Sequence, residues 1–313
     1  TVCAPVILQK IKNQGYKGGV TILRDYLKEN RGRVKVRKAF IRFEADPGQE
    51  IQIDWGHFGS IDYGHTKRKL YALAVIESYS RLLYVEFTHS QKQAVLHSCL
   101  LNAFKYFGGT PKTVLVDNMV TAVIDRQGRL IRFNDAFLDF LRPFHIVPKA
   151  CNVRAPNEKG KIENSIKYLR GNFMPLREFT DLGDLQTQVL DWLDKVANAR
   201  IHQTTGEVPK ERFKTVGLGP LPPQVIEPLE TETLLVHKDF AVKFDGNSYT
   251  TPSWAIGRKL TLKANQQKVW IYHKEKRVCS HCRSWERKKR IENPTHVEQV
   301  KKLKRRRSEE RRV

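Results

Sequence analysis

Residues 52–56, QIDWG, and residues 113–117, TVLVD, decide the fold of this chain. Each stretch places an aspartate, Asp54 or Asp117, where a short apolar strand is expected to end. Ligand sites in open α/β sheets gather at the carboxyl ends of strands, so neighbouring strands of this kind would bring the two acids together. The TVLV stretch is wholly apolar, which is typical of a buried strand, and we expect it to run parallel to the first.

Around these two strands the sequence predicts a βββαβα order. The further strands are apolar and rich in β-branched and aromatic residues, and the helices show apolar residues near helical spacing. The predicted elements are strands over 69–76, 82–87 and 145–148 and helices over 90–107, 134–141, 160–173 and 185–200. For the last helix we expect a core stripe of Leu185, Val189, Trp192, Leu193 and Val196. The predicted fold class is therefore multidomain α/β with a mixed sheet.

The helix over 160–173 carries a third acid, Glu163. At about 100° per residue, its apolar side chains form one narrow stripe that we expect to be buried: Ile162, Ile166, Leu169 and Phe173. Glu163, Lys167 and Arg170 fall together on the adjoining face. In isolation, this spacing is that of an ordinary i,i+4 surface ion pair. The surroundings favour a metal ligand instead, because residues 142–177 hold eight Lys/Arg and only two acids.

The charge balance indicates a polyanionic partner. The 313 residues include 56 Lys and Arg against 33 Asp and Glu, a net charge of +23. The longest apolar run, residues 70–76, is far too short to cross a bilayer, and no stretch has the pattern of a signal peptide. We therefore expect nucleic acid rather than a membrane as partner. Five scattered cysteines favour a reducing compartment over a disulfide framework.

A helix-turn-helix segment is predicted over residues 1–40. Two apolar-periodic stretches flank the glycine-rich turn at 15–19. The second helix has a basic side for DNA phosphates, made of Arg24, Lys28 and Arg31. An ordinary helical hairpin with a solvated face has the same outline. The basic run RGRVKVRK at 31–38 keeps the DNA interpretation open.

The C-terminal third is predicted to be separate from the core. Residues 217–229 are rich in glycine and proline and predict a linker between a core domain over 46–216 and a small β-barrel over 230–284. The tail over 285–313 is strongly basic, and is either a helix extending over DNA or a disordered arm.

Residues 279–282, Cys-Ser-His-Cys, form one small cluster of metal-ligand types. Structural zinc sites usually show two separated pairs of ligands. The sequence therefore leaves open whether Cys279, His281 and Cys282 bind metal, and favours a chance grouping at a strand end.

QIDWG, LVDN at 115–118 and APNEKGKIEN at 155–164 together resemble the DDE transposases and retroviral-type integrases. Among them the chain is most similar to the IstA-like transposases of insertion sequences, and the resemblance covers most of its length. It implies a ribonuclease H-like core in which Asp54, Asp117 and Glu163 are the catalytic acids and bind two Mg²⁺ or Mn²⁺ ions. The gap from Asp117 to Glu163 is longer than in retroviral integrases, and we expect the extra residues between the strand near His145 and the Glu163 helix.

The resemblance implies a DNA transposase that binds transposon ends, cleaves at their 3′ ends and transfers the strands into target DNA. The implied partners are double-stranded DNA, further copies of the chain in a homo-multimer, and a separate AAA+ ATPase of the IstB-like kind. The implied location is the bacterial cytoplasm, at the nucleoid. Two alternatives stay open: a catalytically inactive DNA-binding protein, and a ribonuclease H-type nuclease without strand transfer. The predicted DNA contacts are Arg24, Lys28, Arg31, Lys149, Arg154, Lys159, Lys161, Lys167 and Arg170, and Asn118 and Asn164 are expected to support the acids or contact DNA.

Overall fold

The computed structural model describes residues 4–30, 44–117, 119, 121–127, 130–151 and 156–310. The chain divides into two compact units, residues 1–42 and 43–313. In the first unit, helices α1 (Ala4–Lys12) and α2 (Val20–Asn30) are joined by a turn in which Gly15 has a φ of +94°. Leu23 of α2 is buried. No helix in the described ranges has both the length and the apolar character that a bilayer span needs.

The second unit is built on a five-stranded mixed sheet with the order β3-β2-β1-β4-β7. Its strands are β1 (Glu50–Asp62), β2 (Lys67–Glu77), β3 (Leu83–Thr88), β4 (Thr113–Val116) and β7 (Val147–Ala150). The first three form an antiparallel meander, whereas β4 runs parallel to both β1 and β7. The predicted parallel pairing of the TVLV strand is confirmed, and so is the α/β class with a mixed sheet.

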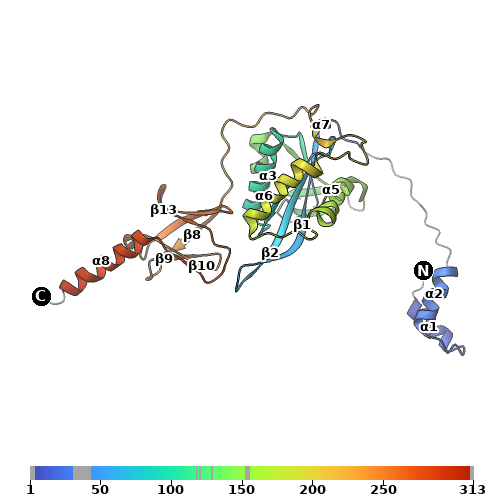
Figure 1. The fold of residues 1–313 in the computed structure, drawn as a ribbon, viewed down its shortest axis with the longest axis horizontal. Coiled ribbons are helices and arrows are strands. Elements are labelled where there is room, and N and C mark those ends of the chain that lie inside the picture. The colour runs from blue at the N-terminus through green and yellow to red at the C-terminus, as the bar shows by residue number, and fades with distance from the viewer. Residues whose placement is uncertain are drawn as a thin grey trace. The chain divides into compact units, whose positions relative to one another are not determined.

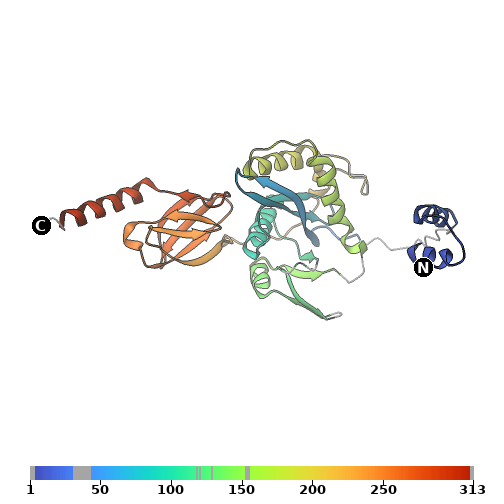
Figure 2. The same cartoon turned by 90° about the horizontal axis from the view of Figure 1, so that it is seen from below.

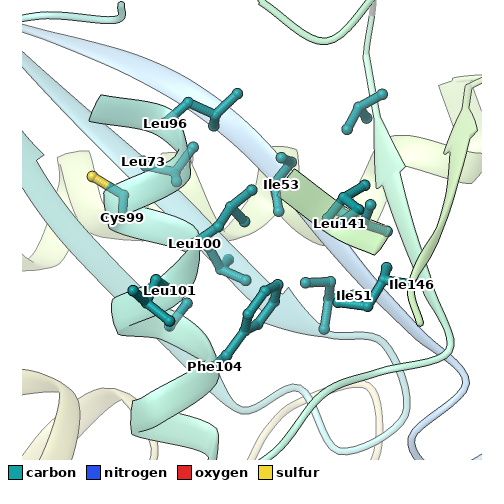
Figure 3. Packing of buried hydrophobic residues seen from close by; sticks show 14 of the residues in the cluster. Ile51, Ile53, Leu73, Leu96, Cys99, Leu100, Leu101, Phe104, Leu141 and Ile146 are labelled. Carbon is teal, nitrogen blue, oxygen red and sulfur yellow. The ribbon is translucent and has the colours of Figure 1, made fainter. Parts of the chain in front are cut away.

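Helices cover both faces of this sheet (Figure 1). Helices α3 (Gln93–Phe107) and α4 (Asp135–Leu141) pack with Ile51 and Ile53 on one face, as Figure 3 shows for α3. Helices α5 (Pro156–Tyr168) and α6 (Leu182–Trp192) share a second apolar core with β2 and β3 on the opposite face, and Figure 2 shows these layers from below. Since side chains alternate along a strand, Gln52 and Asp54 face α5.

Each helix on the α5 face ends in a π turn, over Leu169–Phe173 and Leu193–Ala197. The Asn198 N–H donates to the Leu193 carbonyl at 2.9 Å, an i→i+5 bond that adds a residue to the turn. The predicted core stripe is therefore wrong at its end: Val196 is 40% exposed and Ala197 is buried. Asn198 turns inward instead.

A hairpin that the sequence analysis did not predict follows Asp117. It consists of β5 (Val123–Gln127) and β6 (Leu130–Phe133). The extra length between Asp117 and Glu163 was expected after β7, but only residues 151–155 separate β7 from α5. That expectation is wrong, because the hairpin takes up the additional residues before α4.

The C-terminal strands are present and pair as two small sheets around one core. One sheet joins β8 (Glu230–Leu235), β11 (Lys259–Ala264), β12 (Lys268–His273) and β13 (Lys276–Cys282). The other joins β9 (Ala241–Phe244), β10 (Asn247–Thr250) and β14 (Arg290–Ile291). The predicted basic tail over 285–313 contains strand β14, and from Pro294 to Glu310 it is a helix, α8. The short helix α7 (Pro209–Phe213) precedes this C-terminal region.

Candidate active site

Asp54 and Asp117 lie next to each other in the strand register. The parallel pairing of β1 with β4 matches Glu50 to Thr113 and ends with Ile53 opposite Val116. Asp54 follows Ile53 and Asp117 follows Val116 in the sequence, and both aspartates are partly exposed. The two aspartates therefore directly follow the last paired residues of β1 and β4. The expected strand end at Asp54 is wrong, because β1 continues to Asp62 in its pairing with β2.

Helix α5 lies along β1 on the face to which Asp54 points. The backbone N–H of Ile162 donates to the side-chain oxygen of Gln52 at 3.3 Å. One turn further along α5 lies Ile166, whose Cγ2 would be 3.2 Å from a Cβ placed on Gly56 of β1. Two points of contact therefore fix the course of α5 over β1, one on each side of Asp54.

The same contacts fix the level of Glu163. Ile162 of α5 is hydrogen-bonded to Gln52 of β1. Glu163 is the next residue after Ile162, and Asp54 lies two residues after Gln52, so both acids are close in sequence to this contact. Glu163 is partly exposed, as the two aspartates are. The three acids thus come from three separate parts of the fold: Asp54 from β1, Asp117 from the residue after β4, and Glu163 from α5. Oxygen donors of this kind are the ligands that Mg²⁺ prefers, so the donor set fits a divalent cation.

The orientation predicted for α5 is confirmed. Its apolar stripe is buried, with exposed fractions of 6% or less at Ile162, Ile166, Leu169 and Phe173. Lys167 and Arg170, on the same side as Glu163, are exposed. The Arg170 guanidinium lies 3.3 Å from the His57 carbonyl oxygen and 5.3 Å from the ring centre of Phe58. These contacts hold the positive charge of Arg170 against the part of β1 that follows Asp54.

Lys161 lies in a partly buried ion cluster rather than on the open surface. Its side chain is 15% exposed and its ammonium lies 3.7 Å from Glu44, which pairs with Arg81 at 2.6 Å. Burial lowers the pKa of Lys161, and the charge of Arg81 adds to this. Burial alone would raise the pKa of Glu44, but the hydrogen bond and charge of Arg81 hold it below its usual value. A cavity of about 580 Å³ next to this cluster is also lined by the exposed Lys149.

The remaining predicted DNA contacts are spread over both units. Arg24 and Lys28 are exposed on α2 of the first unit, and Asn164 is exposed on α5. Arg31, Arg154 and Asn118 lie outside the described residues, as does the side chain of Lys159.

The sequence analysis missed one member of the Cys/His cluster. The structure groups Cys279 and His281 with His296 of α8, whereas Cys282 is exposed. No spacing in the sequence points to His296, because the packing of α8 against the C-terminal sheets brings it there.

Two protein families match parts of the chain. The integrase core domain matches residues 44–156, and the C-terminal domain of Mu transposase matches residues 221–293. The first match includes Asp54 and Asp117 and ends before Glu163, so the position of Glu163 on α5 is an independent observation.

Several curated transposases are similar in sequence. The putative transposase for insertion sequence element IS5376 of Geobacillus stearothermophilus is 35% identical over 254 residues, which cover 81% of this chain and 63% of the relative. The transposase for IS21 of Pseudomonas aeruginosa is 32% identical over 280 residues, which cover 88% of this chain and 71% of the relative. The chain thus spans about two thirds of the length of these relatives.

A solved structure gives a weaker likeness. A chain of the simian T-cell lymphotropic virus intasome, in complex with PP2A regulatory subunit B56 gamma, is 14% identical with a TM-score of 0.42, covering 89% of this chain and 93% of that one. At this score the likeness adds nothing to the family matches.

Proposed function

Because this chain belongs to the family of insertion-sequence transposases that includes the IS21 transposase, we propose that it joins transposon ends to target DNA, with Asp54, Asp117 and Glu163 as its catalytic acids. Its integrase core is that of the DDE polynucleotidyl transferases. The observation that supports the proposal is the register of β1 and β4, which ends at Ile53 and Val116, the residues directly before the two aspartates.

The three acids would hold two Mg²⁺ or Mn²⁺ ions. Bound there, such ions would supply a nucleophilic oxygen at neutral pH and offset negative charge on the scissile phosphate. The role of the chain is to keep the carboxylates in place. The Gln52–Ile162 hydrogen bond and the close packing at Gly56 support that role for α5, because both resist movement of Glu163 relative to Asp54.

Lys167 and Arg170 would bind the phosphates of the DNA strand that enters the site. Both are exposed on the Glu163 side of α5, four and seven residues further along the helix. Phosphate contacts of this kind position the duplex without reading its sequence. Arg170 is already oriented by the His57 carbonyl and the Phe58 ring, so less side-chain entropy is lost when it binds.

The proposed joining step is a transesterification. The 3′-hydroxyl of the transposon end gives up its proton as its oxygen bonds to a target phosphorus. The bond from that phosphorus to the target 3′ oxygen breaks, and the released oxygen takes up a proton, so that one is lost and one is gained. One phosphodiester bond replaces another, so no nucleotide hydrolysis is needed. The preceding cleavage uses water in place of the 3′-hydroxyl and frees the transposon end.

The partners follow from this chemistry and from the family. Joining two ends to one target requires two active sites, so we propose that copies of the chain assemble on paired ends. The sequence contains no G-x-x-x-x-G-K-S/T run for nucleotide phosphates. On the family resemblance, we assign target selection to a separate AAA+ ATPase and place the complex on DNA in the bacterial nucleoid.

The test is a joining assay with the purified chain, a labelled duplex with pre-cleaved ends from the host element, and a plasmid target in Mn²⁺. We expect joined products from the wild type and none from Asp117→Asn, while a mobility-shift assay gives the same DNA affinity for both. DNA binding without joining by the wild type would favour the inactive binding protein. Strand cleavage without joined products would favour a ribonuclease H-type nuclease.

A further inference from the structure

A second group of metal-ligand types lies far along the chain from the three acids. One ligand atom from each of Cys279, His281 and His296 lies within 4.8 Å of the others. His281 and His296 are 8% and 4% exposed, and Cys279 is partly buried. Two buried imidazoles beside a thiol are unusual in a small apolar core, because burying a polar ring nitrogen costs free energy unless a partner compensates for it.

The strand register explains why two of these residues meet and why Cys282 is left out. On β13, Cys279 pairs with Ile271 and His281 with Val269, both fully buried on β12. Cys279 and His281 therefore point into the core. Cys282 belongs to the opposite face and is exposed.

The third residue comes from the start of helix α8. The Asn293 N–H donates to the Thr250 hydroxyl at 2.9 Å, and that hydroxyl lies 3.2 Å from His296 Nδ1. The Thr250 carbonyl oxygen lies 2.8 Å from His281 Nε2 and accepts a weaker contact from the Cys279 thiol at 3.8 Å. Thr250, at the end of β10 and fully buried, is thus the common neighbour of all three side chains.

We propose that Cys279, His281 and His296 form a zinc site that fastens helix α8 to the C-terminal sheets. Zinc binds cysteine sulfur and histidine nitrogen at about 2.0–2.3 Å, so tetrahedral ligand atoms lie roughly 3.3–3.8 Å apart. The observed separation of up to 4.8 Å closes to that range with small side-chain rotations. Water or an oxygen of Thr250 would take the fourth position.

The donor set distinguishes this site from the one at the three acids. A thiolate and two imidazoles suit Zn²⁺, whereas carboxylates suit Mg²⁺ and Mn²⁺. Burial lowers the pKa of His281 and of His296, which keeps the imidazoles neutral as ligands must be. Burial raises the pKa of the Cys279 thiol to about 12, so zinc binding would displace a proton from it.

The consequence concerns the basic helix. Beyond His296, α8 carries Lys301, Lys302 and Lys304, all exposed. A metal that links His296 to β13 would fix the direction in which these lysines leave the C-terminal sheets. Without metal, α8 is held at its start mainly by Thr250 and by a 3.4 Å contact from the Ser253 N–H to Gln299.

The test measures metal directly, on the tag-free full chain purified with Zn²⁺ and passed through metal-free buffer. Mass spectrometry should find about one zinc per chain for the wild type. The matched controls Cys282→Ser and His273→Ala, which change the nearby exposed cysteine and the other histidine of this sheet, should keep it. Cys279→Ser and His296→Gln should each lose at least nine tenths of it.

Cobalt substitution and hydrogen exchange add readouts that do not depend on DNA. Co²⁺ should give a thiolate charge-transfer band that survives Cys282→Ser and vanishes in Cys279→Ser. Removing zinc from the wild type should speed amide exchange at the start of α8 by tenfold or more. Wild-type protein that holds no zinc above the level of Cys279→Ser would overturn the proposal, even if the variants fold poorly. Zinc that depends on Cys282 or His273 instead would also overturn it.

Discussion

Gly56→Ala tests how α5 is held over β1. Gly56 is a buried residue in the extended strand, and an added Cβ would lie 2.5 Å from a Phe58 ring carbon and 3.2 Å from Ile166 Cγ2. Carbon atoms pack at about 3.5–4.0 Å, so both neighbours must move. Phe58 packs edge-on against Phe87 and lies under Arg170, so a movement of its ring disturbs both contacts.

The size of the effect follows from two opposing contributions. Overpacking a core with one added carbon costs about 1–3 kcal/mol. Replacing glycine by alanine in a compatible backbone recovers about 0.4–1 kcal/mol through the unfolded state. We therefore expect Gly56→Ala to lower the free energy of unfolding by about 0.5–2 kcal/mol. Because Ile166 lies three residues after Glu163, we also expect DNA joining to fall by about tenfold, since displacements near 1 Å cost up to about a hundredfold.

Urea denaturation followed by tryptophan fluorescence measures the stability, and the joining assay measures the activity. Gly160→Ala is the matched control for stability: it lies in the same helix, and its added Cβ would meet nothing within 4 Å. Gly160→Ala should raise the free energy of unfolding by about 0.5–1 kcal/mol, the difference in helix propensity. A Gly56→Ala chain that is as stable as the wild type and joins DNA at the same rate would refute the reasoning about α5.

Three further predictions concern the core, its pH dependence and DNA binding. Asn198→Ala should lower the free energy of unfolding by about 2–6 kcal/mol in urea titrations, because it leaves the buried N–H and C=O of Leu83 unpaired, each at a cost of about 1–3 kcal/mol; an unchanged midpoint would contradict this. Burial lowers the pKa of His97 from 6.5 to about 4, so the unfolded chain takes up this proton first and stability falls as the pH drops through that window. His97→Phe should make the fall from pH 6.5 to about 4 smaller than in the wild type, and an equal fall in both proteins would count against it. The double variant Lys167→Ala with Arg170→Ala should reduce the slope of log affinity against log salt by about 1.8 in fluorescence-anisotropy titrations, as the loss of two phosphate contacts requires; a double variant with the wild-type slope would remove these residues from the DNA interface.

The parts of the fold that could be predicted are those in which local pattern and tertiary packing agree. The TVLV strand has the predicted bounds, 113–116, because it is short, apolar and buried on both faces. The buried stripe of α5 was predicted because four apolar residues at helical spacing leave one possible inward face. The position of Asp117 directly after the TVLV strand follows from the same pattern. The predicted strand end near Asp54 is wrong, because the antiparallel pairing with β2 carries β1 on to Asp62.

The parts that could not be predicted depend on tertiary structure or on broken periodicity. The π turn after Trp192 shifts the helix by one residue, so Val196 turns outward and Asn198 reaches β3, which an unbroken 3.6-residue period does not allow. The hairpin β5–β6 did leave a signal that was overlooked: short apolar stretches at 122–124 and 130–131 on either side of a polar turn with Gly128. His296 left none, since its partners on β13 lie in a different element.

The most direct test of the central claim compares Asp54→Asn, Glu163→Gln and the double variant in the joining assay with Mg²⁺. If the three acids act as one metal-binding unit, each single variant should reduce joining to background, and the double variant should be no worse than either. DNA binding should be unchanged in all three. A single variant that still joins DNA within tenfold of the wild-type rate would contradict the assignment of that acid to the site.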